Sequence, residues 1–300
     1  SLLDVDPVRF AQVLEKVDLF AHKMSELLSL GREVKDWSQH RQKELKKDIE
    51  RMPEGEERDR ALGSVGVHYQ SPASRFHHLS NYLTLAINGV FLEDLVLKSI
   101  AEGRKPLVAV ANTGDTLMRD LIASHWDNDD ADNEDSASVM KGSAYVLPEK
   151  PHLGHVVKRV ADRLLTVKES NGFGAVTEIR LHEYEDWLAD FNARVDAADF
   201  SMLSMTVIDD LAVALEKHGL SLGEITGRTF MSRPAEDGSG FVISARSKPL
   251  KHDVVSDFNN GRVDVLILNQ SAAVGLSAQA SPANGFDVRQ REMIKAQMQG

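Results

Sequence analysis

The sequence has no cysteine among its 300 residues. This excludes disulfide bonds, cysteine nucleophiles and thiolate zinc sites, and it fits a reducing cytoplasm. No apolar run approaches the roughly 18 residues that a membrane-spanning helix needs, so we expect no membrane partner. The first residues carry neither an initiator methionine nor a signal-peptide pattern, which suggests a trimmed chain or a fragment.

Basic side chains are also in the minority. The 35 Lys and Arg residues face 46 Asp and Glu residues, and the formal net charge is −11. Such a balance argues against a generally basic nucleic-acid-binding surface. Much of the excess comes from one acidic stretch at residues 127–135. A local basic groove therefore remains compatible with the sequence, and six Lys and Arg residues around the last predicted strand favour one: Arg228, Arg246, Lys248, Lys251, Arg289 and Arg291.

Residues 1–100 are predicted to be mainly helical. Apolar residues recur at spacings of three and four from Phe10 to Leu28, as on one face of a helix. Asp6-Pro7 is a typical helix start, and we expect Gly31 to end this helix. Residues 32–60 are very polar, which predicts a charged helical arm broken near Pro53. Another helical pattern covers residues 79–101.

From residue 101 onward the pattern changes to strands alternating with helices. Short apolar runs predict strands at 106–111, 221–226, 241–245 and 263–268, and helical patterns cover 115–125, 153–168, 182–198, 206–218 and 250–260. Residues 127–150 are expected to form an acidic loop. Alternation of this kind predicts an α/β fold, with a parallel sheet covered by helices on both faces.

The most informative segment is FNNGRVDVLILNQSAAVGLS at residues 258–277. It contains a glycine turn, a buried strand and a loop of small residues after the strand. In open α/β sheets, ligands bind at the carboxyl edge of the strands, and small residues let backbone N–H groups approach phosphates. The alternative is a loop that is shaped only by packing.

This segment resembles motif V of superfamily 2 helicases. KPLVAVANTG at 105–114 resembles motif IV, and EITGR at 224–228 resembles the strand and turn between the two motifs. The segments RFHHL at 75–79, EITGR and FDVRQREMI at 286–294 are similar to those of strawberry-notch-type helicases and the phage and plasmid methylase–helicase group. The resemblance covers about residues 70–294, and it is weak from 127 to 200.

The resemblance implies a second RecA-like motor domain at 101–300 of a DNA helicase or translocase in a bacterial or phage-infected cell. ATP and Mg²⁺ would bind between it and the first RecA-like domain of the full-length protein. Contacts to the DNA backbone are then expected from six residues, and Gly275 and Ser277 are expected to face the nucleotide cleft. The six are Asn112, Thr113, Arg228, Asn269, Gln270 and Ser271.

Several departures from the family pattern limit what this chain can do alone. No Walker A loop is present, since GEITGRT at 223–229 is one residue short and has arginine where lysine is needed. No Asp-Glu pair for Mg²⁺ follows an apolar strand, and the arginine-bearing motif VI is expected only beyond Gly300. We therefore predict a domain truncated before motif VI, with no catalytic residue, no metal site and no cofactor bound by this chain alone.

Two other interpretations stay open at this point. A degenerate helicase-like module would bind DNA or protein without turnover, for example as a phage antirestriction or structural component. A nucleotide-binding α/β enzyme unrelated to helicases would share only the alternation of strands and helices. A Walker A segment upstream in the parent gene would favour the helicase, and a native stop near Gly300 would favour the degenerate module.

The missing motifs generate a direct prediction. The 300-residue chain should release no phosphate from ATP, with or without DNA, because it lacks the groups that hold the γ-phosphate and Mg²⁺. A longer parent protein that supplies the first motor domain should hydrolyse ATP in the same buffer. Phosphate release measured for both proteins in matched salt checks this, and turnover by the 300-residue chain would contradict it.

Overall fold

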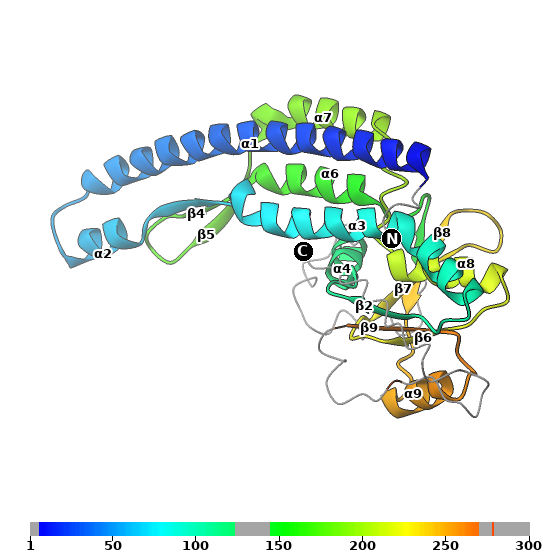
Figure 1. The fold of residues 1–300 in the computed structure, drawn as a ribbon. Coiled ribbons are helices and arrows are strands. Elements are labelled where there is room, and N and C mark those ends of the chain that lie inside the picture. Colours follow the sequence, from blue (N-terminus) through cyan, green and yellow to red (C-terminus); the bar gives the residue numbers. More distant parts are fainter. Residues whose placement is uncertain (1–5, 124–144, 270–277, 279–300) are drawn as a thin grey trace. The chain divides into compact units, whose positions relative to one another are not determined.

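The computed structural model describes residues 6–123, 145–269 and 278. The chain divides into two compact units, whose elements are labelled in Figure 1. Unit 1 comprises Ser1–Val5, Ser80–Leu153 and Ser201–Gly300, and unit 2 comprises Asp6–Leu79 and Gly154–Phe200. This division differs from the single boundary expected near residue 100, because each unit is assembled from separate stretches of the chain.

Unit 1 contains a three-stranded parallel sheet in the order β2-β9-β6. The strands are β2 (Leu107–Val110), β9 (Val265–Asn269) and β6 (Leu222–Ile225). β9 is hydrogen-bonded to a parallel neighbour on each side. The mixed α/β class expected from the sequence is confirmed in this coarse form.

The sheet of unit 1 is covered on both faces because its central strand is apolar throughout. Val265 and Ile267 pack with α3 (Pro72–Ala101) and α8 (Val207–Lys217). The alternate residues Leu266 and Leu268 pack with α9 (Lys251–Asn259). All four side chains are buried, as expected for a strand between two helical layers.

Unit 1 also holds an antiparallel sheet in the order β3-β8-β7. Its strands are β3 (Tyr145–Leu147), β8 (Phe241–Ala245) and β7 (Phe230–Pro234), and α4 (Asp115–Ala123) packs on it through Met118 and Ile122. The strand expected at 241–245 therefore forms, but it does not join the parallel sheet. It pairs with β7 instead, because the chain turns back at Gly238, where φ is +73°.

Unit 2 is built from helices and one antiparallel sheet in the order β1-β4-β5. Its helices are α1 (Pro7–Glu50), α2 (Glu56–Ser64), α6 (Leu153–Leu164), η2 (His182–Tyr184) and α7 (Glu185–Ala197); its strands are β1 (Gly66–Tyr69), β4 (Thr166–Ser170) and β5 (Val176–Arg180). An ion pair between Glu26 and Arg194 joins α1 to α7, and Lys158 joins α6 to Asp196 of α7 at 2.5 Å. None of the described helices has the length and apolar composition needed to cross a membrane.

Two expectations for unit 2 need correction. The first helix does not end at Gly31; this residue is buried within α1, between the buried side chains of Leu30 and Val34. The helix continues to Glu50 and ends before Pro53, as expected from a proline that interrupts the helical pattern. The helix expected at 153–168 ends at Leu164, and the β4–β5 hairpin begins at Thr166.

The close approach of α3 and α8 gives a stability prediction. A Cβ built on Gly89 of α3 would lie 2.5 Å from Val207 Cγ2 of α8. Gly89→Ala should therefore destabilise the protein, because overpacking costs about 1–3 kcal/mol while the helix propensity of alanine returns only about 1 kcal/mol. The matched control is Gly63→Ala in α2, where an added Cβ meets no atom within 4 Å. Urea unfolding should show a loss for Gly89→Ala and an equal or slightly higher stability for Gly63→Ala.

Candidate functional site

The carboxyl ends of the three parallel strands meet at one edge of the sheet in unit 1. Val110 at the end of β2 is in register with Asn269 at the end of β9, and Ile225 at the end of β6 is in register with Leu268. The segments that follow β2 and β6 therefore begin at this edge. The edge thus brings together the predicted contacts Asn112, Thr113, Arg228 and Asn269. Gln270, Ser271, Gly275 and Ser277 lie outside the described residues.

The turn after β2 is fixed by its own side chains. Asn112 Oδ1 accepts a hydrogen bond from Gly114 N at 2.9 Å. Gly114 has a φ of +72°, and a Cβ there would lie 2.6 Å from the carbonyl oxygen of Met205. No larger residue fits without moving the backbone. Asn112 and Thr113 are half-buried in a turn whose shape is set before any ligand arrives.

The turn after β6 is tied to the turn after β2 through one carboxylate. Asp115, the first residue of α4, accepts hydrogen bonds from the backbone N–H groups of Thr229 at 2.7 Å and Phe230 at 3.2 Å. Arg119 extends from the next turn of α4 to the same carboxylate at 3.2 Å and is half-exposed. The edge therefore carries a solvent-accessible cation beside two ordered turns.

Beneath the second turn lies a buried network of charges. Arg228 contacts Asp209 of α8 at 2.7 Å and Glu224 of β6 at 2.6 Å, and all three side chains are less than a tenth exposed. Arg246 adds a contact to Glu224 at 3.2 Å and donates to the Glu224 carbonyl at 3.0 Å. The backbone N–H of Ser232 donates to Asp209 at 3.0 Å. Two guanidinium groups thus balance two carboxylates.

Burial and pairing act against each other in this network. Burial raises the pKa of Asp209, even though Arg228 favours its charged form. Burial would also raise the pKa of Glu224, but hydrogen bonds from Arg228 and Thr226 outweigh it, so the pKa of Glu224 is lowered. Burial lowers the pKa of Arg246. Arg228 is the central cation of the network, and its own pKa is raised because its two carboxylate partners outweigh its burial.

This position gives Arg228 a different role from the predicted one. Its guanidinium is paired on both sides and donates to the Phe230 carbonyl at 3.3 Å, so no part of it is left for a phosphate unless the network breaks. We therefore assign Arg228 to the support of the sheet edge and not to contact with nucleic acid. The sequence analysis identified Arg228 as a candidate functional residue. It did not predict the ion pair with Asp209, which lies on the preceding helix α8.

The loop between β8 and α9 contributes a further cation at this edge. Lys248 is exposed and donates to the carbonyl of Gly227 at 3.0 Å. The sequence analysis placed Lys248 among six basic residues around the last predicted strand. In the structure, its hydrogen bond to Gly227 ties it to the turn after β6. Lys248 and Arg119 are thus two solvent-accessible cations that contact the turns at this edge.

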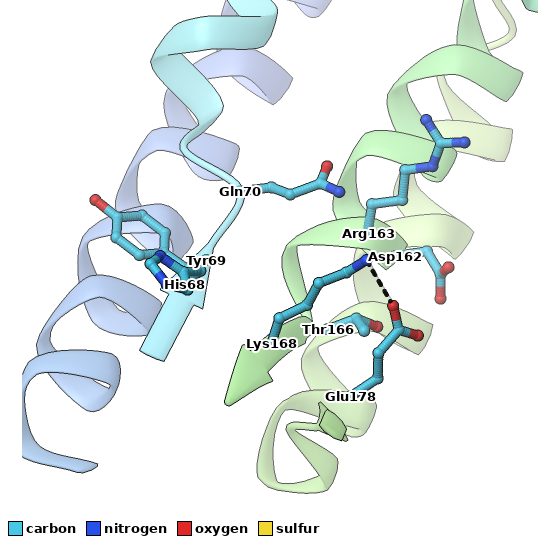
Figure 2. Close-up of a pocket in the computed structure, with 8 residues that line it drawn as sticks. All are labelled: His68, Tyr69, Gln70, Asp162, Arg163, Thr166, Lys168 and Glu178. Carbon is cyan, nitrogen blue, oxygen red and sulfur yellow. Dashed lines mark ion pairs between the residues drawn. The ribbon is translucent and has the colours of Figure 1, made fainter. Parts of the chain in front are cut away.

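Unit 2 has a separate surface pocket of about 380 Å³ between β1, the end of α6 and the β4–β5 hairpin (Figure 2). Lys168 points toward Glu178 across β4 and β5, and these side chains form an ion pair of 3.1 Å. Asp162 pairs with Arg180 at 2.8 Å. Both carboxylates are therefore paired with adjacent cations.

Comparisons with protein-family models, with curated proteins and with solved structures found no match to this chain.

The network predicts how stability depends on Arg228. Arg228→Met should lower the free energy of unfolding by about 3–5 kcal/mol, because two buried carboxylates lose their shared partner. The pKa of Asp209, already raised by burial, should then rise further, and the pKa of Glu224 should rise above its unfolded value. The folded variant therefore binds more protons and loses stability as pH rises. The loss should be larger near pH 8 than near pH 5 in urea unfolding.

Arg233→Met is the matched control for this experiment. Arg233 pairs with Glu216 at 2.9 Å on the surface of the same unit, and a solvent-exposed pair contributes about 1 kcal/mol or less. A loss for Arg228→Met no larger than that of the control, or one that does not change with pH, would show that the network does not support the fold.

Proposed function

We propose that unit 1 is the second RecA-like domain of a DNA helicase or translocase, and that the carboxyl edge of its parallel sheet binds the DNA backbone. The observation that carries the proposal is the convergence of the motif IV-like, EITGR and motif V-like strands on one edge. The order β2-β9-β6 places the motif V-like strand between the other two. Helices on both faces complete the layered arrangement that such a domain requires.

The edge has donors suited to phosphate oxygens. Asn112 uses its Oδ1 atom within the turn, which leaves its amide N–H groups to donate outward. Thr113 adds a hydroxyl, and Arg119 and Lys248 add positive charge nearby. Contacts of this kind recognise phosphates and not bases, so binding should tolerate any sequence and weaken with salt.

ATP and Mg²⁺ belong in this proposal to a cleft that the first RecA-like domain completes. This chain would contribute one wall of the cleft through the predicted residues Gly275 and Ser277. The residues of unit 1 hold DNA, and opening and closing of the cleft would move the two domains along the strand. The degenerate module without turnover differs from this proposal only in the absence of that cycle.

Asn112→Asp tests the proposed DNA contact. A carboxylate oxygen can still accept the hydrogen bond from Gly114, so the turn is preserved, but the substitution removes the donor and adds a negative charge. Affinity for single-stranded DNA, measured by fluorescence anisotropy, should fall about tenfold, which corresponds to about 1.4 kcal/mol.

Asn171→Asp provides a matched control in unit 2. Asn171 Oδ1 accepts a hydrogen bond from Phe173 N at 2.8 Å, so the same turn chemistry and the same charge change occur away from the sheet edge. This variant should bind DNA as the unaltered chain does. Equal losses in both variants, or no loss for Asn112→Asp, would remove the sheet edge as the binding site.

A further inference from the structure

The second half of α1 carries a stripe of unpaired positive charge. Arg32, Lys35, Lys43 and Lys46 are all exposed, with the exposed Gln39 between them; we call these five positions the cationic stripe. At about 100° per residue, the four cations fall within an arc of about 80° on the helix. Their Cα positions extend over about 21 Å, at about 1.5 Å per residue.

Three of the five acidic residues in this half of α1, Glu33, Glu44 and Asp48, lie on other faces of the helix, whereas Glu50 falls within the arc of the stripe and Asp36 lies beside it. Glu44 pairs with His40 at 3.4 Å and with Arg41 at 3.5 Å, and Asp48 pairs with Arg51 at 3.1 Å. The four cations of the stripe, in contrast, have no hydrogen-bond or ion-pair partner among the residues that the structure describes. Four cations and one carboxylate within the arc leave this side of the helix with an excess of positive charge.

Like charges lie close together within the stripe. Arg32 and Lys35, and likewise Lys43 and Lys46, are like charges at the i,i+3 spacing, which destabilises a helix. Neither Lys35 nor Lys43 has an acidic residue three or four positions away. In a chain with a net charge of −11, such a stripe is a local exception that the helix itself does not require.

We propose that the cationic stripe of α1 is a second nucleic-acid-binding surface, which contacts the phosphates of duplex DNA. A duplex carries one phosphate charge about every 1.7 Å of helix axis, so phosphates are dense enough for each of four cations spread over about 21 Å to meet one. Lysine and arginine on exposed stems adjust to such a row of charges without reading bases. The surface belongs to unit 2, and its charges are independent of the sheet edge in unit 1.

The test uses the full 300-residue chain and a fluorescein-labelled duplex DNA of mixed sequence. The stripe variant is Arg32→Gln, Lys43→Gln and Lys46→Gln combined. The matched control is Arg60→Gln, Lys98→Gln and Lys217→Gln combined, which removes the same charge from exposed positions on other elements. Anisotropy is measured between about 50 and 200 mM salt, where phosphate contacts dominate the salt dependence.

We expect the stripe variant to bind about tenfold or more weakly, and its slope of log affinity against log salt should be shallower by about 2 to 3, since each lost duplex contact removes about 0.9. The control should keep both values. Gln39→Lys should do the reverse and steepen the slope by about 0.9, whereas Gln12→Lys on another face of α1 should not. This gain-of-function pair remains informative if the triple variant unfolds.

Equal behaviour of the stripe and control variants would overturn the proposal. So would binding of phosphatidylserine vesicles without binding of DNA, because the occupant would then be a lipid surface. Loss of single-stranded DNA binding in Asn112→Asp, together with an unaffected stripe variant, would keep the sheet edge and reject the stripe. The opposite pattern would keep the stripe and reject the sheet edge.

Discussion

The two-sided hydrogen bonding of β9 is the constraint on which the architecture of unit 1 depends. β9 is parallel to β2 on one side and to β6 on the other, so the ends of all three strands are aligned by backbone geometry alone. Its alternating side chains bury Val265 and Ile267 against α3 and α8, and Leu266 and Leu268 against α9. A slip of β9 by one residue would exchange these two sets between the faces. The site at the carboxyl edge is a consequence of that register.

The buried charges around Arg228 constrain the structure of unit 1 in a different way from apolar packing. Apolar packing tolerates many side chains of similar volume, whereas Arg228 must meet Asp209 and Glu224 with the correct geometry. The network joins α8 to the end of β6, and Asp115 then joins that turn to α4. The two turns at the sheet edge, which we propose as the DNA-binding surface, are therefore positioned by charges buried beneath them. Such positioning is expected where donors must be in place before the ligand binds.

The parts of the fold that the sequence predicted are those whose signal is local. β2 and β9 are apolar runs bounded by turns, and parallel strands end at a common edge, so Asn112, Thr113 and Asn269 could be grouped in advance. β4 and β5 were missed because Thr166–Ser170 and Val176–Arg180 are half polar and follow directly on a helical pattern. The burial of Arg228 was missed because it depends on Asp209, 19 positions away on another element. From the charge of Arg228 alone, a position at the surface was the expected one.

The central position of β9 also determines when the parallel sheet can form during synthesis. Among the described strands of this sheet, β2 and β6 each pair with β9 and not with each other, and β9 is the last of the three along the sequence. During synthesis, the backbone groups with which β2 and β6 pair with β9 remain without this partner until residues 265–269 have emerged. Unit 2 has its last segment, Gly154–Phe200, much sooner. Unpaired apolar strands are the usual starting points for misassembly, so the interval before β9 arrives is when a nascent chain of this protein is most exposed to aggregation.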